Sequence, residues 1–442
     1  MFNIFIFFGL SGCSDKDINN ELVHFIKKNP NIPIKNKFGG VLNNIKLSNI
    51  ELENANFSDI LIINSSFENV NFKNPNFYNV KIKSSEIKYS NLQYAIFSSL
   101  ICQESNLDGT KFKNSKFINS FFSNSSLDSI SIKDSTIINT KFNKIDFEHT
   151  IFSNNTFEKS TIKQSNLLNS KINKTNFINT NIYNSDFTNV ELENVNIDNS
   201  HIKVNNFFNT KFFTTTITNS KLEFINFNNI ISDNFILKNS TLDKILFNRS
   251  SIDNLILQDV NSNYLTLTKN QITKLNCENV KLDNNEFNQN KINIFNLKGS
   301  IINTSSFNIN NIKDFNITNT SAENATLEYE NYENFNTKQI QIKFFAIKNS
   351  KINLIKFELS ELNYFSLIKN NIQTISFVNN KIDSLSFLNG SFNLLELDKI
   401  NIKNSIIFNS NIKVLDSYDI KGQNNIIINS NINLFSFKNL IL

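Results

Sequence analysis

The residue types that most often carry chemistry are scarce and widely separated in this chain of 442 residues. The cysteines are Cys13, Cys102 and Cys277, and the histidines are His24, His149 and His201. A zinc site needs several such ligands at short, regular spacings, and no His, Cys and Asp spacing here resembles one. The glycines are few and form no loop of the kind that cradles a phosphate. We therefore expect no metal, no cofactor and no nucleophilic catalysis.

Two short segments collect tyrosines and acids, which are plausible contact groups for a partner. The segment SAENATLEYENYENFNTKQ contains Glu328, Tyr329, Glu330, Tyr332 and Glu333, and the segment LDSYDIKG contains Asp416, Tyr418 and Asp419. Both segments interrupt the repeat described below. Because burying an unpaired carboxylate is costly, we expect the coil around Glu330 to bulge outward. The two segments are our candidate interaction surface, and local irregularity without a function is the alternative.

The first residues, MFNIFIFFGLSGC, are an apolar run that ends in Leu10, Ser11, Gly12 and Cys13. They resemble the bacterial lipobox, at which a leader is cut and the cysteine sulfur is lipidated. The resemblance implies a signal peptide at residues 1–12 and a lipid on Cys13 that anchors the protein to a membrane without spanning it. No lysine or arginine precedes the run, so an upstream start, or an apolar first strand with an incidental cysteine, stays open.

A single helix is expected directly after this segment, in SDKDINNELVHFIKKNP. Ser14 or Asp15 can cap its start, Lys27 and Lys28 suit its last turn, and Pro30 stops it. Residues 13–41 are thus predicted to hold the lipidated N-terminus, the helix and a connector. The helix either covers the first coil of a repeat domain or belongs to a flexible tether.

A five-residue repeat fills the rest of the chain, residues 42–442. Every fifth residue from Leu42 to Leu442 is Leu, Ile, Phe or Tyr, with eight exceptions. The exceptions are Cys102, Ser232, Ser262, Cys277, Ala322, Thr337, Ser417 and Gly422. This period fits neither a helix nor an ordinary half-buried strand. It indicates a backbone that turns in the same way every five residues.

The positions that flank each central residue are regular as well. The residue two before it is often Ser or Thr, and the residue two after it is often Asn, which tolerates the left-handed backbone of a corner. Units such as SNL at 105–107, ANF at 55–57 and SDF at 185–187 resemble the pentapeptide-repeat family, whose units read Ala-Asp/Asn-Leu-x-x. The resemblance implies an all-β fold, a right-handed quadrilateral β-helix of about 20 coils with one pentapeptide on each face.

A second period, of 20 residues, is visible in the later part of the repeat. The residue two before the centre is large at Phe235, Leu255, Leu275, Phe295, Phe315, Phe335, Ile355, Ile375, Leu395, Leu415 and Phe435. Ten residues further along, the equivalent residues are mostly small or polar. From about residue 225 we expect an elongated coil with two broad faces and two narrow ones.

The positions of two cysteines within the repeat indicate their role. Cys102 and Cys277 both occupy central positions, about nine coils and roughly 40 Å apart. A disulfide needs α-carbons within about 7 Å, so the two cannot bond within one chain. We predict that both are small core residues.

The overall charge limits the class of partner. The formal net charge is +5 and Arg249 is the only arginine, so nucleic acid is an unlikely partner. The leading hypothesis is a non-enzymatic, lipid-anchored structural or protein-binding scaffold of the bacterial cell envelope, at the outer membrane if the cell is Gram-negative. The alternatives are a cytoplasmic DNA-mimicking pentapeptide protein that acts on a topoisomerase, and a β-helix enzyme that acts on polysaccharide.

The last residues suggest one further partner. The repeat continues in frame to Leu442 with FSFKNLIL and no polar cap. Because an uncovered strand edge invites pairing, an end-to-end homodimer through the C-terminal coil is a further hypothesis.

Overall fold

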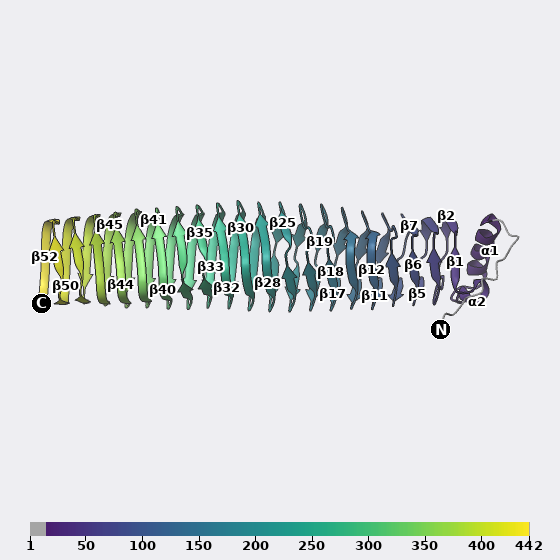
Figure 1. Cartoon of the computed structure of the whole chain (residues 1–442), viewed down its shortest axis with the longest axis horizontal. Helices are drawn as coiled ribbons and strands as arrows, with labels where there is room; N and C mark the ends of the chain where they lie inside the picture. Colours follow the sequence, from purple (N-terminus) through teal and green to yellow (C-terminus); the bar gives the residue numbers. More distant parts are fainter. Residues whose placement is uncertain (1–14, 442) are drawn as a thin grey trace, which may run out of the picture. The chain divides into compact units, whose positions relative to one another are not determined.

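The computed structural model describes residues 15–441, so the expected signal peptide at 1–12 and the lipidation site Cys13 lie outside the described residues. The chain forms two compact units, Met1–Val190 and Glu191–Leu442, and each is described by itself. In both units the strands of successive coils lie side by side in parallel (Figure 1). The units are therefore all-β solenoids, as the repeat predicts.

The expected helix is present at the start of the first unit as α1 (Asp15–Lys28), with its basic residues in the last turn. Its apolar side is buried, with Leu22 at 0% and Ile26 at 2% exposure. The backbone N–H of Lys46, in the first coil, donates a hydrogen bond to Asn19 Oδ1 at 3.1 Å. The helix thus packs on the first coil instead of standing away from it as a tether.

A second, shorter helix was not expected from the sequence. It is α2 (Lys35–Phe38), and the ring of Phe38 packs edge-on against Phe25 of α1 with centroids 5.7 Å apart. Within residues 15–441, neither helix has the length and apolar character needed to cross a membrane.

The first unit is built from short strands separated by corners. A typical pair is β10 (Lys111–Lys113) and β13 (Ser131–Lys133), in which each residue lies beside the residue twenty positions later. The backbone takes a left-handed conformation at almost every fifth residue, for example φ 47° at Asn139 and 54° at His149. A corner every five residues and a register of twenty give four faces per coil. The four-sided coil predicted from the repeat is confirmed for this unit.

The interior of the first unit is a stack of central residues. Phe57, Phe77 and Phe97 are all buried, and each ring stacks on the next with centroids 5.0 Å apart. Buried serines fill the positions between the stacks, as where the N–H of Ser115 donates to Ser135 Oγ at 3.1 Å. Each buried ring contributes about 2–3 kcal/mol of transfer free energy, and each hydroxyl satisfies a main-chain group of the neighbouring coil.

The second unit changes to longer strands. From β28 (Lys221–Asn228) onward, most strands have eight residues, as in β29 (Ile231–Lys238) and β30 (Thr241–Asn248). The twenty-residue register is kept, so Phe227 pairs with Phe247. Two long strands therefore replace four short ones in most coils, close to the position expected from the sequence.

The physical reason for the longer strands is the size of the inward residue two positions before each central residue. Phe235 and Leu255 occupy this inward position and are completely buried, where the first unit has a small serine or threonine. In β29 and β31 (Ser251–Gln258), two large inward residues continue the flat face and the left-handed corner between them is lost, whereas β28 and β30 keep φ 55° at Phe224 and Lys244. From Ile309 to Lys399, left-handed residues occur only at intervals of ten, for example at Asn319, Tyr329 and Gln339.

Candidate functional site

The first predicted contact segment does not bulge outward, which corrects the expectation from sequence. The strands β40 (Ser321–Glu328) and β41 (Asn331–Lys338) keep their register with the coils on either side. Glu330 is 2% exposed and Tyr332 is 1% exposed, so both side chains point into the core. Inside the core, Glu330 Oε1 accepts hydrogen bonds from Asn310 N at 3.2 Å and from Asn310 Nδ2 at 3.0 Å.

The other members of this segment do reach the surface. Tyr329 is 57% exposed at the turn after β40, and Glu333 is exposed on β41. Glu328 is half-buried and accepts a hydrogen bond from Asn349 Nδ2 at 3.1 Å. These three residues remain candidates for contact, whereas Glu330 and Tyr332 are interior residues.

The second predicted segment lies on β50 (Asn411–Gln423) in the same unit. Asp416 and Tyr418 are exposed, Asp419 is half-buried at a left-handed turn, and Lys438 Nζ lies 5.6 Å from the Tyr418 ring centroid. Tyr329 and Asp419 are four and a half coils of twenty residues apart, so their turns lie half a coil apart around the solenoid. The structure therefore does not bring the two predicted segments together into one surface.

The two cysteines within the described residues are core residues, as predicted. Cys102 and Cys277 are free thiols and are buried. Burial raises the pKa of the Cys102 thiol to about 12 and also raises the pKa of the Cys277 thiol. Neither is a reactive thiolate at neutral pH.

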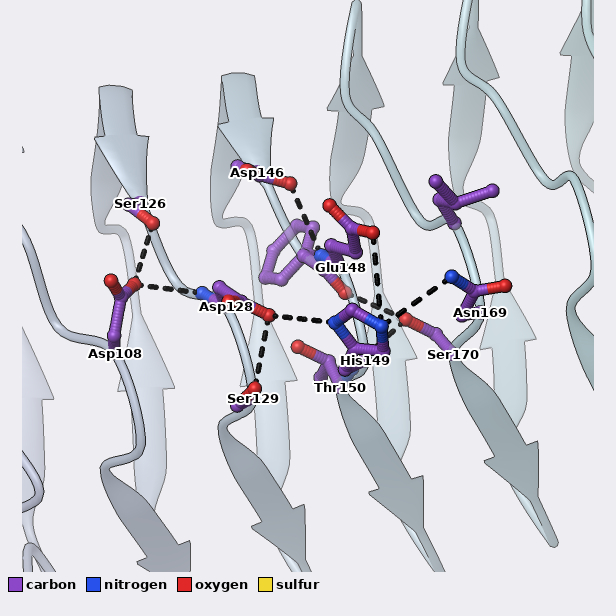
Figure 2. Close-up of polar contacts among 12 residues, drawn as sticks. Asp108, Ser126, Asp128, Ser129, Asp146, Glu148, His149, Thr150, Asn169 and Ser170 are labelled. Carbon is purple, nitrogen blue, oxygen red and sulfur yellow. Dashed lines mark hydrogen bonds and ion pairs between the residues drawn. The ribbon is translucent and has the colours of Figure 1, made fainter.

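One outward histidine lies in an acidic cluster that the sequence analysis did not identify (Figure 2). His149 Nδ1 lies 3.3 Å from Asp128 Oδ1, and its Nε2 lies 3.7 Å from Glu148 Oε1 and 3.4 Å from Asn169 Nδ2. Asp108 Oδ1 accepts hydrogen bonds from Ser126 Oγ at 2.5 Å and Asp128 N at 3.0 Å. The sequence feature that could have predicted this cluster is the spacing of Asp108, Asp128 and Glu148 by twenty residues, the length of one coil.

The second outward histidine, His201, is part of a charged cluster in the second unit. Glu223 Oε2 lies 2.8 Å from His201 Nε2, and its Oε1 lies 2.7 Å from Lys221 Nζ. Donation from Lys221 and then His201 lowers the pKa of Glu223 to about 2. Lys203 Nζ also lies 3.4 Å from Glu223 Oε2, so three basic side chains share this one carboxylate. Among residues 15–441, no group of histidines, cysteines and acids is arranged to hold a metal ion.

A groove on the second unit is lined by Lys343 and Asn363, each of which is followed in sequence by an exposed aromatic residue. This groove, of about 520 Å³, crosses the first halves of β40, β42 (Gln341–Lys348) and β44 (Glu361–Ile368). Ala322 lines it, one of the few central residues that is not large, and Glu323 and Lys343 form an ion pair across it at 2.8 Å.

Two aromatic rings lie directly beside this groove. Phe344 and Tyr364 are paired in register on neighbouring strands, and their rings stack with centroids 4.9 Å apart and planes at 8°. They are 44% and 50% exposed. We call the groove with Glu323, Lys343, Phe344 and Tyr364 the groove surface. Sequence reasoning missed it, because an outward aromatic at one position says nothing about the position twenty residues away unless the coil length is used.

Comparison with known proteins supports the repeat assignment for part of the chain. The family model described as pentapeptide repeats matches residues 164–199, in eight copies. No curated protein sequence matches this chain. The family match supports the pentapeptide-repeat interpretation, and it indicates no catalytic family.

Several solved structures are similar at low identity. A trypsin-treated variant of QnrB1, a plasmid-mediated fluoroquinolone resistance protein, is 13% identical, with 41% of this chain and 84% of that chain covered and a TM-score of 0.32. HetL, a pentapeptide repeat protein involved in heterocyst differentiation regulation from the cyanobacterium Nostoc, is 11% identical, with 55% and 93% covered and a TM-score of 0.26. The alginate lyase AlyGC is 9% identical, with 94% of this chain and 98% of that chain covered and a TM-score of 0.19. At these scores, the strand register of each unit remains the basis for the fold.

Proposed function

We propose that this protein is a non-enzymatic scaffold that binds a protein partner through the groove surface. The observation that carries the proposal is the exposed, stacked pair of Phe344 and Tyr364 beside a groove. Aromatic side chains are enriched at the centres of protein interfaces, where they bury a large area at a small cost in conformational entropy. Serving as such a contact requires no catalytic group.

The charges at the groove favour a protein over a nucleic acid. Lys343 is paired with Glu323, and Lys381 at the far edge of the neighbouring coil is paired with Glu361 at 3.3 Å. A phosphate backbone is bound by several unpaired cations that release counterions. A mixed rim of acids and lysines around an apolar centre suits the surface of another protein.

The proposed site of action is the bacterial cell envelope, with the chain held there by a lipid on Cys13. The motif Leu10-Ser11-Gly12-Cys13 supports this anchor, and Ser14 after the cysteine favours the outer membrane of a Gram-negative cell. An end-to-end homodimer through the C-terminal coil stays a hypothesis, supported by the exposed residues Ile426 and Ile427. A monomer by light scattering at micromolar concentration would contradict it.

Two other functions need separate tests. A topoisomerase-directed role, as in DNA-mimicking pentapeptide proteins, requires a strongly acidic surface, and the net charge here is +5. Unchanged gyrase supercoiling in the presence of the protein would exclude it. A polysaccharide enzyme requires acids facing one groove, but Glu330 faces the core and Glu323 is paired with a lysine.

The test of the groove surface is partner capture by the full chain. We expect the double variant Phe344→Ser and Tyr364→Ser to capture at least tenfold less partner protein than wild type does, as measured by quantitative mass spectrometry. The matched control is Tyr264→Ser, because Tyr264 occupies the same position of an earlier coil and is 49% exposed. Equal capture by wild type and the double variant would refute the proposal, as would an equal loss in the control.

A further inference from the structure

A ladder of buried amides runs along one turn of the second unit. Its members Asn270, Asn290 and Asn310 are spaced by one coil and are all buried. The N–H and Nδ2 of Asn270 both donate to Asn290 Oδ1 at 3.0 Å, and the same two groups of Asn290 donate to Asn310 Oδ1 at 2.9 and 3.0 Å. The amide oxygens of Asn290 and Asn310 therefore each receive two hydrogen bonds from the coil before them.

Each amide nitrogen in the ladder also donates to a main-chain carbonyl. The acceptor lies 23 residues earlier in every case: Nδ2 of Asn290 donates to Leu267 O at 2.7 Å, and Nδ2 of Asn310 donates to Phe287 O at 2.8 Å. The same bond recurs beyond the ladder, from Asn370 Nδ2 to Ile347 O at 2.8 Å. An asparagine at this inward position thus supplies one acceptor atom and one donor atom from the same side chain.

Glu330 occupies the next position of this ladder. Its Oε1 replaces an amide oxygen and accepts from Asn310 N at 3.2 Å and Asn310 Nδ2 at 3.0 Å. Its Oε2 takes the place of an amide nitrogen but has no hydrogen-bond partner, and neither has the hydroxyl of Tyr332. An asparagine at position 330 would donate from Nδ2 to the main-chain carbonyl 23 residues earlier, which is that of Phe307.

A carboxylate at this position is unfavourable in two ways. An anionic Oε2 can only accept hydrogen bonds, whereas the asparagines of the ladder present a donor to a main-chain carbonyl there. The charge is also removed from water, since Glu330 is 2% exposed. A protonated Oε2 removes both problems, because its O–H is a donor and the group is neutral.

We propose that Glu330 is held as a neutral carboxylic acid that stands in for an asparagine of this ladder, and that its ionisation destabilises the surrounding coil. The proton leaves Oε2 for bulk water, and the Tyr332 hydroxyl, which lies nearby but makes no hydrogen bond in this structure, is the donor left to the resulting anion. The coil of β40 and β41 is thereby the pH-sensitive element of the second unit.

The surroundings of Glu330 contain little that could compensate its charge. The preceding coil presents Asn310, the following coil presents Ser350 Oγ, which accepts from Glu330 N at 3.0 Å, and its own coil presents the buried Tyr332. The neighbouring charges, Glu328 on β40 and Lys348 on β42, occupy outward positions, and the side chain of Lys351 is exposed. Among the described side chains, Glu330 is the one buried acid, and no lysine, arginine or histidine is buried with it.

The electrostatics agree with the geometry. Burial raises the pKa of Glu330 to about 7, although the groups of Asn310 and the nearby Tyr332 hydroxyl favour the charged form. The same burial, with the charge of Glu330, raises the pKa of Tyr332 well above its ordinary value. Because the folded pKa exceeds the ordinary value of 4.5, the stabilising contribution is complete below pH 4.5 and is lost as the pH rises through about 7.

The experiment compares thermal unfolding of wild type and Glu330→Gln between pH 5 and pH 8. The glutamine supplies the missing donor without a charge, so its melting temperature should change little over this range. Wild type should lose roughly 3–5 °C more than the glutamine variant. Glu333→Gln is the matched control, because Glu333 is an exposed glutamate of the same coil, and it should follow wild type.

A second measurement uses wild type alone and does not depend on a variant that folds. Hydrogen exchange, corrected for its intrinsic pH dependence, should speed up severalfold from pH 5 to pH 8 in peptides of residues 321–338. Peptides of residues 241–258, in an earlier coil of the same unit, should not change. The proposal is overturned if wild type and Glu330→Gln show the same pH dependence, or if exchange at 321–338 is no faster at pH 8.

Discussion

At the scale of single residues, the glutamates of the second unit show how position within the coil determines chemistry. Glu330, two before a centre, is buried and lacks a partner for one oxygen. Glu223, one after a centre, is surrounded by cations and has a pKa of about 2. Glu361 is exposed and has one lysine partner at 3.3 Å. A glutamate side chain therefore destabilises the fold, stabilises it or has little effect on its stability, according to its position in the coil.

The Glu223 cluster leads to a stability prediction. Replacing Glu223 with glutamine should lower the free energy of unfolding by about 1–2 kcal/mol at pH 7, because Lys221 and His201 lose a shared, mostly covered partner. The folded pKa is depressed, so the carboxylate stabilises the fold above pH 4.5 and this contribution is lost as the pH falls toward 2. Urea unfolding at pH 7 and at pH 3 measures the difference.

Glu361→Gln is the control for this prediction, since its single ion pair is exposed and should contribute less than about 0.5 kcal/mol. A Glu223→Gln variant as stable as the control at pH 7 would show that the cluster is not stabilising.

At the scale of elements, the strands do not stand alone and depend on the coil on each side. A three-residue strand such as β13 buries a single large side chain, and its hydrogen bonds run to the coils before and after it. The first coil has no preceding coil, and the amphipathic helix α1 packs there in its place. Capping elements of this kind protect an open edge from other chains.

The helix is expected to stabilise the first coil by packing. Leu22→Ala should lower the free energy of unfolding by about 2–4 kcal/mol, because a fully buried side chain is removed. Hydrogen exchange should rise in β1 (Val41–Asn43) and β2 (Lys46–Glu51), the strands of the first coil, which α1 contacts through the hydrogen bond from Lys46 N to Asn19. Lys27→Ala, on the exposed side of α1, is the control and should change neither quantity. Unaltered protection of β1 and β2 in Leu22→Ala would contradict the capping role.

At the scale of the whole molecule, the composition suits presentation of a surface more than catalysis. Acids and lysines are interspersed along the outward positions, and the net charge of +5 is small for 442 residues. The groove surface, the acidic cluster around His149 and the Glu223 cluster all consist of side chains one coil apart. A function that uses such rows needs a partner with an extended matching surface.

The proposed anchor concerns the whole molecule and can be tested directly. Radiolabelled palmitate should be incorporated into the wild-type protein in cells and absent from Cys13→Ala, because the thiol of Cys13 is the proposed attachment point. Cys102→Ala is the control and should keep the label, since Cys102 is buried in the core. Absence of label from wild type would remove the envelope proposal and favour a cytoplasmic role.

Much of the fold could be predicted because the repeat states the same local rule many times. Central residues such as Phe57 and Phe112 are buried, left-handed corners occur where asparagines recur, and the change near residue 225 follows from inward residues such as Phe235. Local rules sufficed because each coil contacts only its neighbours. The second helix, α2, has too short a pattern to be recognised in this way.

The sequence by itself determined the five-residue period, the inward positions and the twenty-residue coil, because these depend on side-chain size and on asparagine at corners. Only the tertiary structure decided which side chains of neighbouring coils contact each other. It placed Glu330 in line with Asn310, so the coil stays in register instead of bulging, and it stacked Phe344 on Tyr364. The physical reason is that hydrogen bonding and ring stacking act between residues twenty apart, where a partner is defined by the turns of the backbone and not by the local sequence.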